Sequence, residues 1–399
     1  MSITTAERPA ASALPFDSAK LDRLMDAAGM DALLISSKHN VSYMLGGYRA
    51  FFFDYMDAIG QSRYLPLLVY PKGAPERAAY IASRMEAYDK EVRQCWPDMR
   101  PAAMGTEDAV EQAAEHIQRI GLASGRIGIE SAFLPADAHA ALQRALPQAR
   151  TTDGLRVLER LRAVKRPEEL EQLRESSERV IDAMLAVIGS HGPGATKRQL
   201  VEALRREEVQ RGLTFEYCLI TAGTSLNRAP SDQVWGAGDI LSLDSGGNFH
   251  GYIGDICRMA IHGEPDAELQ DLLAEVDAVQ QAAFRPVRHG ALGAELYASA
   301  EGVLNRAPDR EHMEFVAHGM GLISHEVPHL TSKGPVPYPA EDAERPLEAG
   351  MVLSIETTLK HPRRGFIKLE DTVAVQPDGY VMYGEAGRGW NRGGNRRSS

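Results

Sequence analysis

Four carboxylates and one histidine in the second half of the chain stand in strand-like, largely apolar contexts. They are Asp244 in "ILSLDSGG", Asp255 in "YIGDICR", His318 in "AHGMG", Glu356 in "VLSIETTL" and Glu370 in "IKLEDTV". Side chains on a strand alternate between its two faces, so an acid inside such a strand faces either water or a partner. Burial of an unpaired carboxylate costs at least several kcal/mol. A shared cation would remove that cost, and an oxygen-rich set with one imidazole suits Mn, Co or Zn.

Taken one at a time, these residues have a simpler interpretation. An isolated acid in a strand is more often a rim or turn residue, and "LDSGGNFHGYIGDICRM" (243–259) could be a hairpin with two exposed aspartates joined by a Gly-rich turn. The recurrence of one such residue on several strands favours a metal site, at which two divalent ions would satisfy four carboxylates and one imidazole.

The elements that precede this cluster predict a separate α/β domain over residues 16–157. Leu21, Leu24 and Met25 have helical spacing, and Gly29 ends that helix. Strands are predicted in "DALLIS", "YLPLLVYP", "RAAYIA" and "RIGIES", and helices in "TEDAVEQAAEHIQRIG", with Thr106 as its cap, and "PADAHAALQRAL". Alternating strands and helices are typical of α/β architecture.

A second domain is predicted over residues 158–385. It contains a helix from Pro167, which suits the first turn, followed by Glu168 and Glu169 at the positive end of the helix dipole. The later pieces are mostly strand-like, which predicts an α+β domain with a mainly antiparallel sheet. The Gly/Arg-rich residues 386–399 are expected to form a solvated tail, and residues 1–15 a disordered lead without the apolar region of a signal peptide.

Composition excludes several classes of function. The chain has 399 residues, of which 44% are hydrophobic and 25% charged, and a formal net charge of −11, which argues against a general nucleic-acid binder. Its three cysteines form no CxxC pair, so a reducing compartment, the cytoplasm, is expected. No apolar run reaches the ~18–20 residues of a membrane span, so no membrane partner is expected.

The order and spacing of the five polar residues resemble those of metallopeptidase family M24, the pita-bread fold of methionine aminopeptidase, aminopeptidase P, prolidase and creatinase. "GDILSLDSGGNFHGYIGDICR" resembles the paired-Asp segment, "AHGMGLISHE" the GHGxGxxxHE-type segment, and "MVLSIETTL" and "GFIKLEDTVAV" the two strands that carry glutamates. "LRAVKRPEELEQLR" resembles the helix entry that follows a creatinase-type N-terminal domain. The resemblance covers residues 16–385 and implies a smaller α/β creatinase-like domain before a pita-bread domain with a curved sheet.

The resemblance also implies roles for individual residues. Two divalent ions (Mn, Co, Zn or Fe) would be held by Asp244, Asp255, His318, Glu356 and Glu370. Glu356 would also orient or deprotonate the attacking water, and His325 would hydrogen-bond the substrate carbonyl and the developing oxyanion. Arg258, three residues after Asp255, is expected to pair with an acid for a structural purpose.

One position departs from the pattern of the peptidases. Their additional histidine, upstream of the first aspartate strand, falls at Asn227 here, beside Arg228, and no histidine lies between His191 and His250. Asn cannot carry charge, whereas Arg228 could bind a substrate carboxylate. Asn227 and Arg228 are therefore the predicted substrate-binding residues.

These observations predict a homodimeric, metal-dependent hydrolase of the Xaa-Pro peptidase or prolidase type, which cleaves a C–N bond of a small peptide. One alternative is a non-peptidase relative, a hydrolase or lyase acting on a small charged or cyclic metabolite. Another is a catalytically inactive binding module, although such modules usually lose metal ligands and none is lost here.

Overall fold

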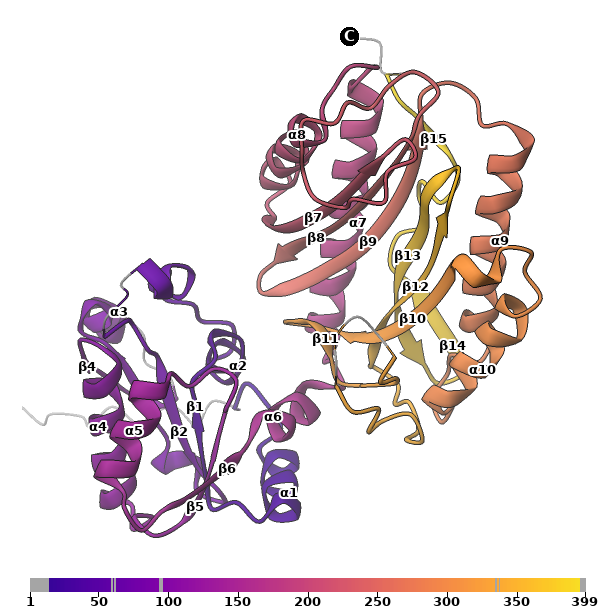
Figure 1. Cartoon of the computed structure of the whole chain (residues 1–399). Helices are drawn as coiled ribbons and strands as arrows, with labels where there is room; N and C mark the ends of the chain where they lie inside the picture. The colour runs from indigo at the N-terminus through magenta and orange to yellow at the C-terminus, as the bar shows by residue number, and fades with distance from the viewer. Residues whose placement is uncertain are drawn as a thin grey trace, which may run out of the picture. The chain divides into compact units, whose positions relative to one another are not determined.

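The chain forms two compact units that meet in sequence between Arg162 and Ala163 (Figure 1). The computed structural model describes residues 14–58, 60, 62–92, 96–333, 336 and 338–394. Most of the predicted N-terminal lead, residues 1–13, lies outside the described residues. None of the described helices combines the length and the apolar character that a membrane span requires.

The first unit contains a mixed sheet flanked by helices, as the alternating pattern predicts. From edge to edge the strands are β4 (Asp98–Ala103), β3 (Ala79–Ser83), β2 (Leu67–Pro71), β1 (Ala32–Ile35), β5 (Arg126–Ile129) and β6 (Arg150–Asp153). The α-helices are α1 (Ser18–Ala28), α2 (Lys38–Met44), α3 (Ala87–Val92), α4 (Thr106–Arg119), α5 (Ala136–Ala145) and α6 (Leu155–Arg162), and 3-10 turns span Phe51–Ala58, Pro75–Arg77 and Arg84–Glu86.

The core of this unit forms where apolar side chains of the strands meet α4 and α5. Val69, Ile81, Val110, Ile117 and Leu142 are among its buried members. Thr106 is the first residue of α4 and not its cap, because the N-cap position is Gly105 and the Thr106 hydroxyl donates to Asp137 Oδ2 at 2.8 Å instead.

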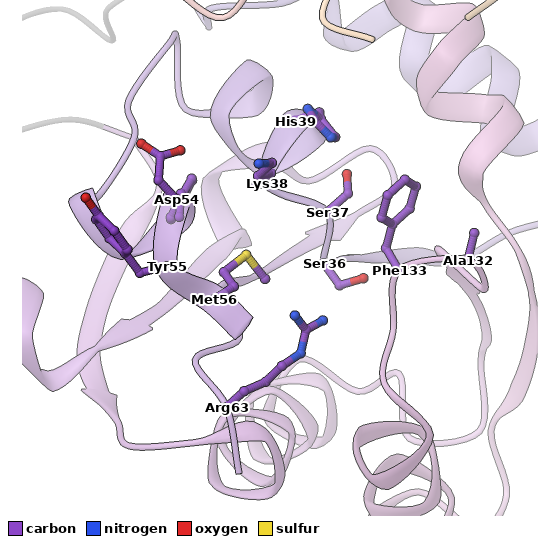
Figure 2. A pocket seen from close by; sticks show the side chains of 11 residues that line it. Ser36, Ser37, Lys38, His39, Asp54, Tyr55, Met56, Arg63, Ala132 and Phe133 are labelled. Atoms are coloured by element: carbon purple, nitrogen blue, oxygen red, sulfur yellow. The ribbon is translucent and has the colours of Figure 1, made fainter. Parts of the chain in front are cut away.

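A cavity of about 480 Å³ lies within the first unit (Figure 2). Ser36 and Ser37 form part of its wall, and their backbone N–H groups donate to the buried carboxylate Oε2 of Glu130 at 2.5 and 2.7 Å. The exposed aromatic side chain of Tyr55 also lines this cavity, and the neighbouring Phe51 is exposed as well.

The second unit is built on one large sheet, antiparallel except for the pairing of one short strand. Its main path runs β11 (Ser324–Glu326), β10 (Met313–Met320), β12 (Val352–His361), β13 (Gly365–Gln376), β9 (Tyr252–Ile261), β8 (Ile240–Phe249) and β7 (Thr214–Ala222). β14 (Gly379–Met382) pairs with β13, and β15 (Asn391–Arg392) pairs with β9 in parallel. The helices are α7 (Pro167–Ser190), α8 (Lys197–Gln210), α9 (Ala267–Phe284) and α10 (Gly293–Leu304), with a 3-10 turn over Arg310–His312.

Helix α7 packs closely against the β8–β9 hairpin. Pro167 occupies its first turn, as the sequence predicts, and Glu169 Oε2 accepts from the Arg166 backbone N–H at 2.8 Å. Ser176 Oγ donates to the Gly247 carbonyl at 2.7 Å and accepts from the Gly254 N–H at 2.9 Å. A Cβ on Gly254 would lie 2.6 Å from the Ser177 nitrogen, so glycine is required for this close approach.

The segment after residue 385 is folded onto the second unit, contrary to the predicted solvated tail. Arg388 forms ion pairs with Asp371 and Asp277, and Trp390 Nε1 donates to the Leu269 carbonyl at 3.1 Å. The arginine-rich composition suggested solvation, but the buried Asp371 offers Arg388 a partner. This correction applies to residues 386–394, since residues 395–399 lie outside the described part of the chain.

Candidate metal centre

The register of the β8–β9 hairpin brings Asp244 and Asp255 to one face of the sheet. Gly246 is directly opposite Asp255, and Asp244 lies two residues before Gly246 on β8. Because residues two apart on a strand share a face, both carboxylates project from the same side. Both side chains are buried, so the alternative of a hairpin with two exposed acids does not hold.

The strands beside this hairpin supply the remaining predicted ligands on the same face. Glu356 on β12 lies opposite Glu370 on β13, and Glu370 lies opposite Cys257, which is two residues after Asp255 on β9. On β10, His318 lies opposite Ser354, two residues before Glu356. The structure therefore brings all five sequence-predicted ligands to one buried cluster.

Three of these side chains present atoms suited to a single cation. One ligand atom each from Asp255, His318 and Glu370 lie within 4.8 Å of one another, and His318 Nε2 is 3.7 Å from Glu370 Oε1. Within the described part of the chain, Asp255 Oδ1 and His318 Nε2 are buried with no hydrogen-bond partner. Such atoms are costly unless something binds them, and a carboxylate–imidazole set fits a divalent transition metal.

Hydroxyl groups fix the orientation of the two carboxylates in this set. Ser324 Oγ donates to Asp255 Oδ2 at 2.9 Å, and Ser354 Oγ donates to Glu370 Oε1 at 2.7 Å. Groups that hydrogen-bond a ligand carboxylate in this way orient it toward the metal.

Lys368 lies at the centre of the cluster, although it is not among the site residues predicted from the sequence. Its Nζ is 2.7 Å from Asp244 Oδ2 and 2.8 Å from Glu370 Oε2, and it also forms an ion pair with Glu356 Oε2. A signal was present in the sequence, because Lys368 stands two residues before Glu370 in an apolar strand and so shares its face.

The concentrated negative charge changes the protonation of the cluster. Burial, followed by the charges of Glu370 and Asp244, raises the pKa of Asp255 to about 8. Burial would also raise the pKa of Glu370, but the neighbouring Lys368 and His318 hold it well below its usual range. For Lys368 burial acts in the opposite direction, yet the surrounding carboxylates raise its pKa well above the usual value. The electrostatic environment of the cluster therefore stabilises a bound cation.

His325 lies against the predicted metal ligand His318. The two rings stack with centroids 3.7 Å apart. Burial, followed by the proximity of His318, lowers the pKa of His325 to about 3, so that its imidazole is neutral. The backbone of His325 has φ +62°, in the left-handed region that only a few residue types other than glycine adopt.

Glu326, the residue that follows His325, forms a buried ion pair with Lys165. Lys165 Nζ lies 2.9 Å from Glu326 Oε1, and each side chain is only 1% exposed. A Cβ on Gly321 would lie 2.2 Å from Glu326 Oε1, so the glycine in the "GMG" segment provides space for this carboxylate.

The two predicted substrate-binding residues occupy different environments. Asn227 is exposed, and its Oδ1 accepts from the Ala229 N–H at 2.9 Å within its own turn. Arg228 forms an ion pair with Asp244, and its guanidinium carbon lies 5.0 Å from the centroid of the Phe366 ring. Arg228 also borders an open cavity of about 500 Å³, whose wall includes Glu356, Thr358 and Phe366.

The expected structural role of Arg258 is confirmed. Its Nη2 lies 2.8 Å from Asp371 Oδ1, and both side chains are fully buried. The arginine also donates to the Glu370 carbonyl at 3.0 Å, which fixes the backbone of β13 at a predicted metal ligand.

A creatinase-type domain followed by a pita-bread domain with this buried carboxylate–histidine cluster defines the class of metal-dependent hydrolases. The chain belongs to metallopeptidase family M24: the model for that family matches residues 171–377, and the model for the Creatinase/Prolidase N-terminal domain matches residues 18–164. The fold class and the family resemblance drawn from the motifs are thereby confirmed.

Relatives cover nearly the whole chain. An uncharacterized peptidase, YqhT, of Bacillus subtilis is 23% identical over 366 residues, which are 90% of this chain and 95% of that one. The solved Xaa-Pro dipeptidase from Bacillus anthracis has a TM-score of 0.77 at 21% identity and covers 93% of this chain and 98% of its own. A dipeptidase from Pyrococcus horikoshii OT3 has a TM-score of 0.78 at 23% identity, with coverages of 94% and 99%. At these identities, the solved structures establish the shared fold.

Proposed function

We propose that this metallohydrolase is of the Xaa-Pro peptidase or prolidase type and cleaves a C–N bond of a small peptide. The observation that carries the proposal is the complete set of five ligands on one sheet face, with the neutral His325 stacked beside it. Relatives that span the chain include proteins named Xaa-Pro dipeptidase, among them that of Lactobacillus delbrueckii, which is 23% identical over 372 residues.

Each site residue has a defined task in this proposal. Divalent metal, when bound, supplies Lewis acidity and lowers the pKa of a water molecule. Glu356 borders the open cavity, where its carboxylate can accept a proton from that water. A neutral imidazole has one ring N–H to donate, and His325 would direct it at the carbonyl oxygen, which gains negative charge as water adds to the carbonyl carbon before the C–N bond breaks.

The identity of the metal and the assembly of the protein are further parts of the proposal. The mixed oxygen and nitrogen donors suit Mn, Co, Zn or Fe, and we expect up to two ions per site. We also expect a cytoplasmic homodimer, which the exposed aromatic side chains of Phe51 and Tyr55 support as a contact surface.

Arg228 favours a substrate with a free carboxylate. Its guanidinium lies between Asp244 and the open cavity, and a planar guanidinium can hold a carboxylate through two hydrogen bonds.

One observation supports the alternative of a non-peptidase relative acting on a small charged metabolite. The residue in place of the peptidases' upstream histidine, Asn227, uses its side chain to stabilise its own turn.

Turnover of a peptide panel tests this proposal. Protein purified without added ions would be assayed with Xaa-Pro dipeptides, their C-terminal amides and dipeptides that lack proline, after addition of Mn²⁺ or Co²⁺. We expect hydrolysis of the free acids, a larger loss on free acids than on amides in Arg228→Ala, and a changed dipeptide rate in Asn227→His.

The possible outcomes separate the two candidate functions. Metal binding without hydrolysis of any peptide in the panel would refute the peptidase and favour the non-peptidase relative. Equal losses on acids and amides in Arg228→Ala would refute carboxylate recognition alone. A protein that binds no metal and hydrolyses nothing would favour the inactive binding module.

A further inference from the structure

The position of Lys368 bears on how many ions the site can hold. Three carboxylates approach its ammonium, namely those of Asp244, Glu356 and Glu370. The Lys368 side chain is only 5% exposed, so this positive charge is a fixed component of the cluster and not a surface group. An ammonium among several carboxylate oxygens satisfies them much as a metal ion would.

The oxygen atoms of the cluster fall into two groups. Asp244 Oδ2, Glu356 Oε2 and Glu370 Oε2 contact Lys368, and Asp244 Oδ2 also contacts Arg228. The other group comprises atoms of Asp255, His318 and Glu370 Oε1, and it includes Asp255 Oδ1 and His318 Nε2, which are buried without a hydrogen-bond partner. Glu370 Oε2 also lacks a hydrogen bond, but it has the Lys368 ammonium at 2.8 Å as an ion-pair partner. Lys368 and Arg228 therefore already contact the first group, whereas among the described residues no lysine or arginine forms an ion pair with Asp255 or with Glu370 Oε1.

Charge balance supports the same division. Once a bound metal ion displaces the proton from Asp255, the four carboxylates contribute −4 and Lys368 with Arg228 contributes +2, which leaves −2 on the cluster. One divalent ion neutralises this charge, whereas a second would leave an excess of +2 in a largely buried site. Uncompensated charge in such a place is strongly unfavourable.

We infer that the Lys368 ammonium occupies the place of a second ion, so that the chain binds one divalent ion tightly at Asp255, His318 and Glu370. A second ion binds only when the ammonium is displaced from Asp244 and Glu356. This inference rests on the metal dependence in the proposed function, but it concerns stoichiometry and affinity and not the substrate.

Metal titration of the folded full-length protein tests the inference without any substrate. Chelated protein would be titrated with Mn²⁺ alone, with free Mn²⁺ followed by its EPR signal and bound metal counted by mass spectrometry after dialysis. We expect one tight ion per wild-type chain and a second at least ~100-fold weaker, equivalent to about 2.8 kcal/mol. Lys368→Met should bind two ions of similar affinity.

Three variants serve as controls. Lys360→Met removes an exposed lysine from β12 that pairs with Glu314, and it should behave as wild type. Lys368→Arg keeps the positive charge and should keep the one-ion stoichiometry. Arg228→Met removes the other cation on Asp244 from a side chain that is 34% exposed, and should tighten the second ion even if Lys368→Met does not fold.

Several results would overturn the inference. Two ions of equal affinity in the wild type would show that a metal ion displaces the Lys368 ammonium without a measurable cost in binding affinity. A Lys368→Met protein with an unchanged melting profile that still binds one ion would show that the lysine does not control the second position. A single tight ion together with no peptide hydrolysis would instead leave this inference standing and refute only the proposed substrate class.

Discussion

Removal of one partner of the buried Lys165–Glu326 pair should destabilise the second unit strongly. The two charges lie 2.9 Å apart with each side chain 1% exposed, and Lys165 Nζ also donates to the Ala163 carbonyl at 3.2 Å. Lys165→Met keeps a flexible chain of similar length but leaves the Glu326 carboxylate buried beside an apolar group.

The expected magnitude follows from burial. Breaking a fully buried ion pair from one side costs about 3–5 kcal/mol, because the remaining charge keeps its desolvation cost without the attraction that offset it. For a domain the size of this second unit, each kcal/mol lowers the melting temperature by about 2–4 °C, so we expect a decrease of roughly 6–20 °C. Glu326→Gln in the Lys165→Met background should recover much of this loss, since a neutral amide costs less to bury than a carboxylate that has lost the Lys165 ammonium.

Calorimetry and urea unfolding of the two single variants and the double variant would measure the interaction as a double-mutant cycle. Lys360→Met is the matched control: its ion pair with Glu314 is 43% and 61% exposed and should contribute less than about 1 kcal/mol. The reasoning fails if Lys165→Met costs no more than this control, or if the double variant is as unstable as Lys165→Met alone.

Three further predictions concern the metal centre and pH. Glu370→Ala should lower both metal content and activity, and a variant that keeps full occupancy and rate would contradict its role as a ligand. His325→Ala should retain metal but lose about 10²–10³ in kcat, as for other oxyanion donors, and an unchanged kcat on the true substrate would remove it from the mechanism. Burial raises the pKa of Glu208 to about 8, so the folded state retains a proton that the unfolded chain loses near pH 4.5, and stability falls as pH rises through this window. Thermal melts should therefore show Glu208→Gln to be more stable than wild type at pH 9, by up to roughly 5 kcal/mol, and equal to it at pH 4; a gain that is the same at both pH values would contradict the assignment.

The metal cluster could be predicted because its residues violate a local rule. A carboxylate in an apolar strand requires a partner, and the order of four such carboxylates with His318 resembles the motifs of family M24, which imply a metal ion as that partner. Lys368 follows the same rule, but the family motifs indicate metal ligands and not an internal cation. The partners of Asn227 and Arg228 depend on how the loop after β7 folds back along that strand, where the Ile220 N–H donates to the Arg228 carbonyl at 2.8 Å, and spacing alone does not determine this path.

Other differences between the predicted and the observed secondary-structure elements also have local causes. The edge strands β4 and β6 escaped prediction because they contain charged and polar residues, and Pro101 in the case of β4, in place of an apolar pattern. The sequence predicts the start of α4 to within one residue, but the cap is Gly105, and the Thr106 hydroxyl bonds to Asp137, which is distant in sequence.

The ion pair between Arg388 and Asp371 links the assembly of the metal centre to the order of synthesis. Asp371 adjoins Glu370 and also binds Arg258, so the strand that carries a predicted ligand gains a partner from a residue made seventeen positions later. While the chain is still being made, β13 lacks this contact until Arg388 has left the ribosome. A nascent chain that stops short of Arg388 therefore has a β13 with one restraint fewer beside the predicted ligand Glu370.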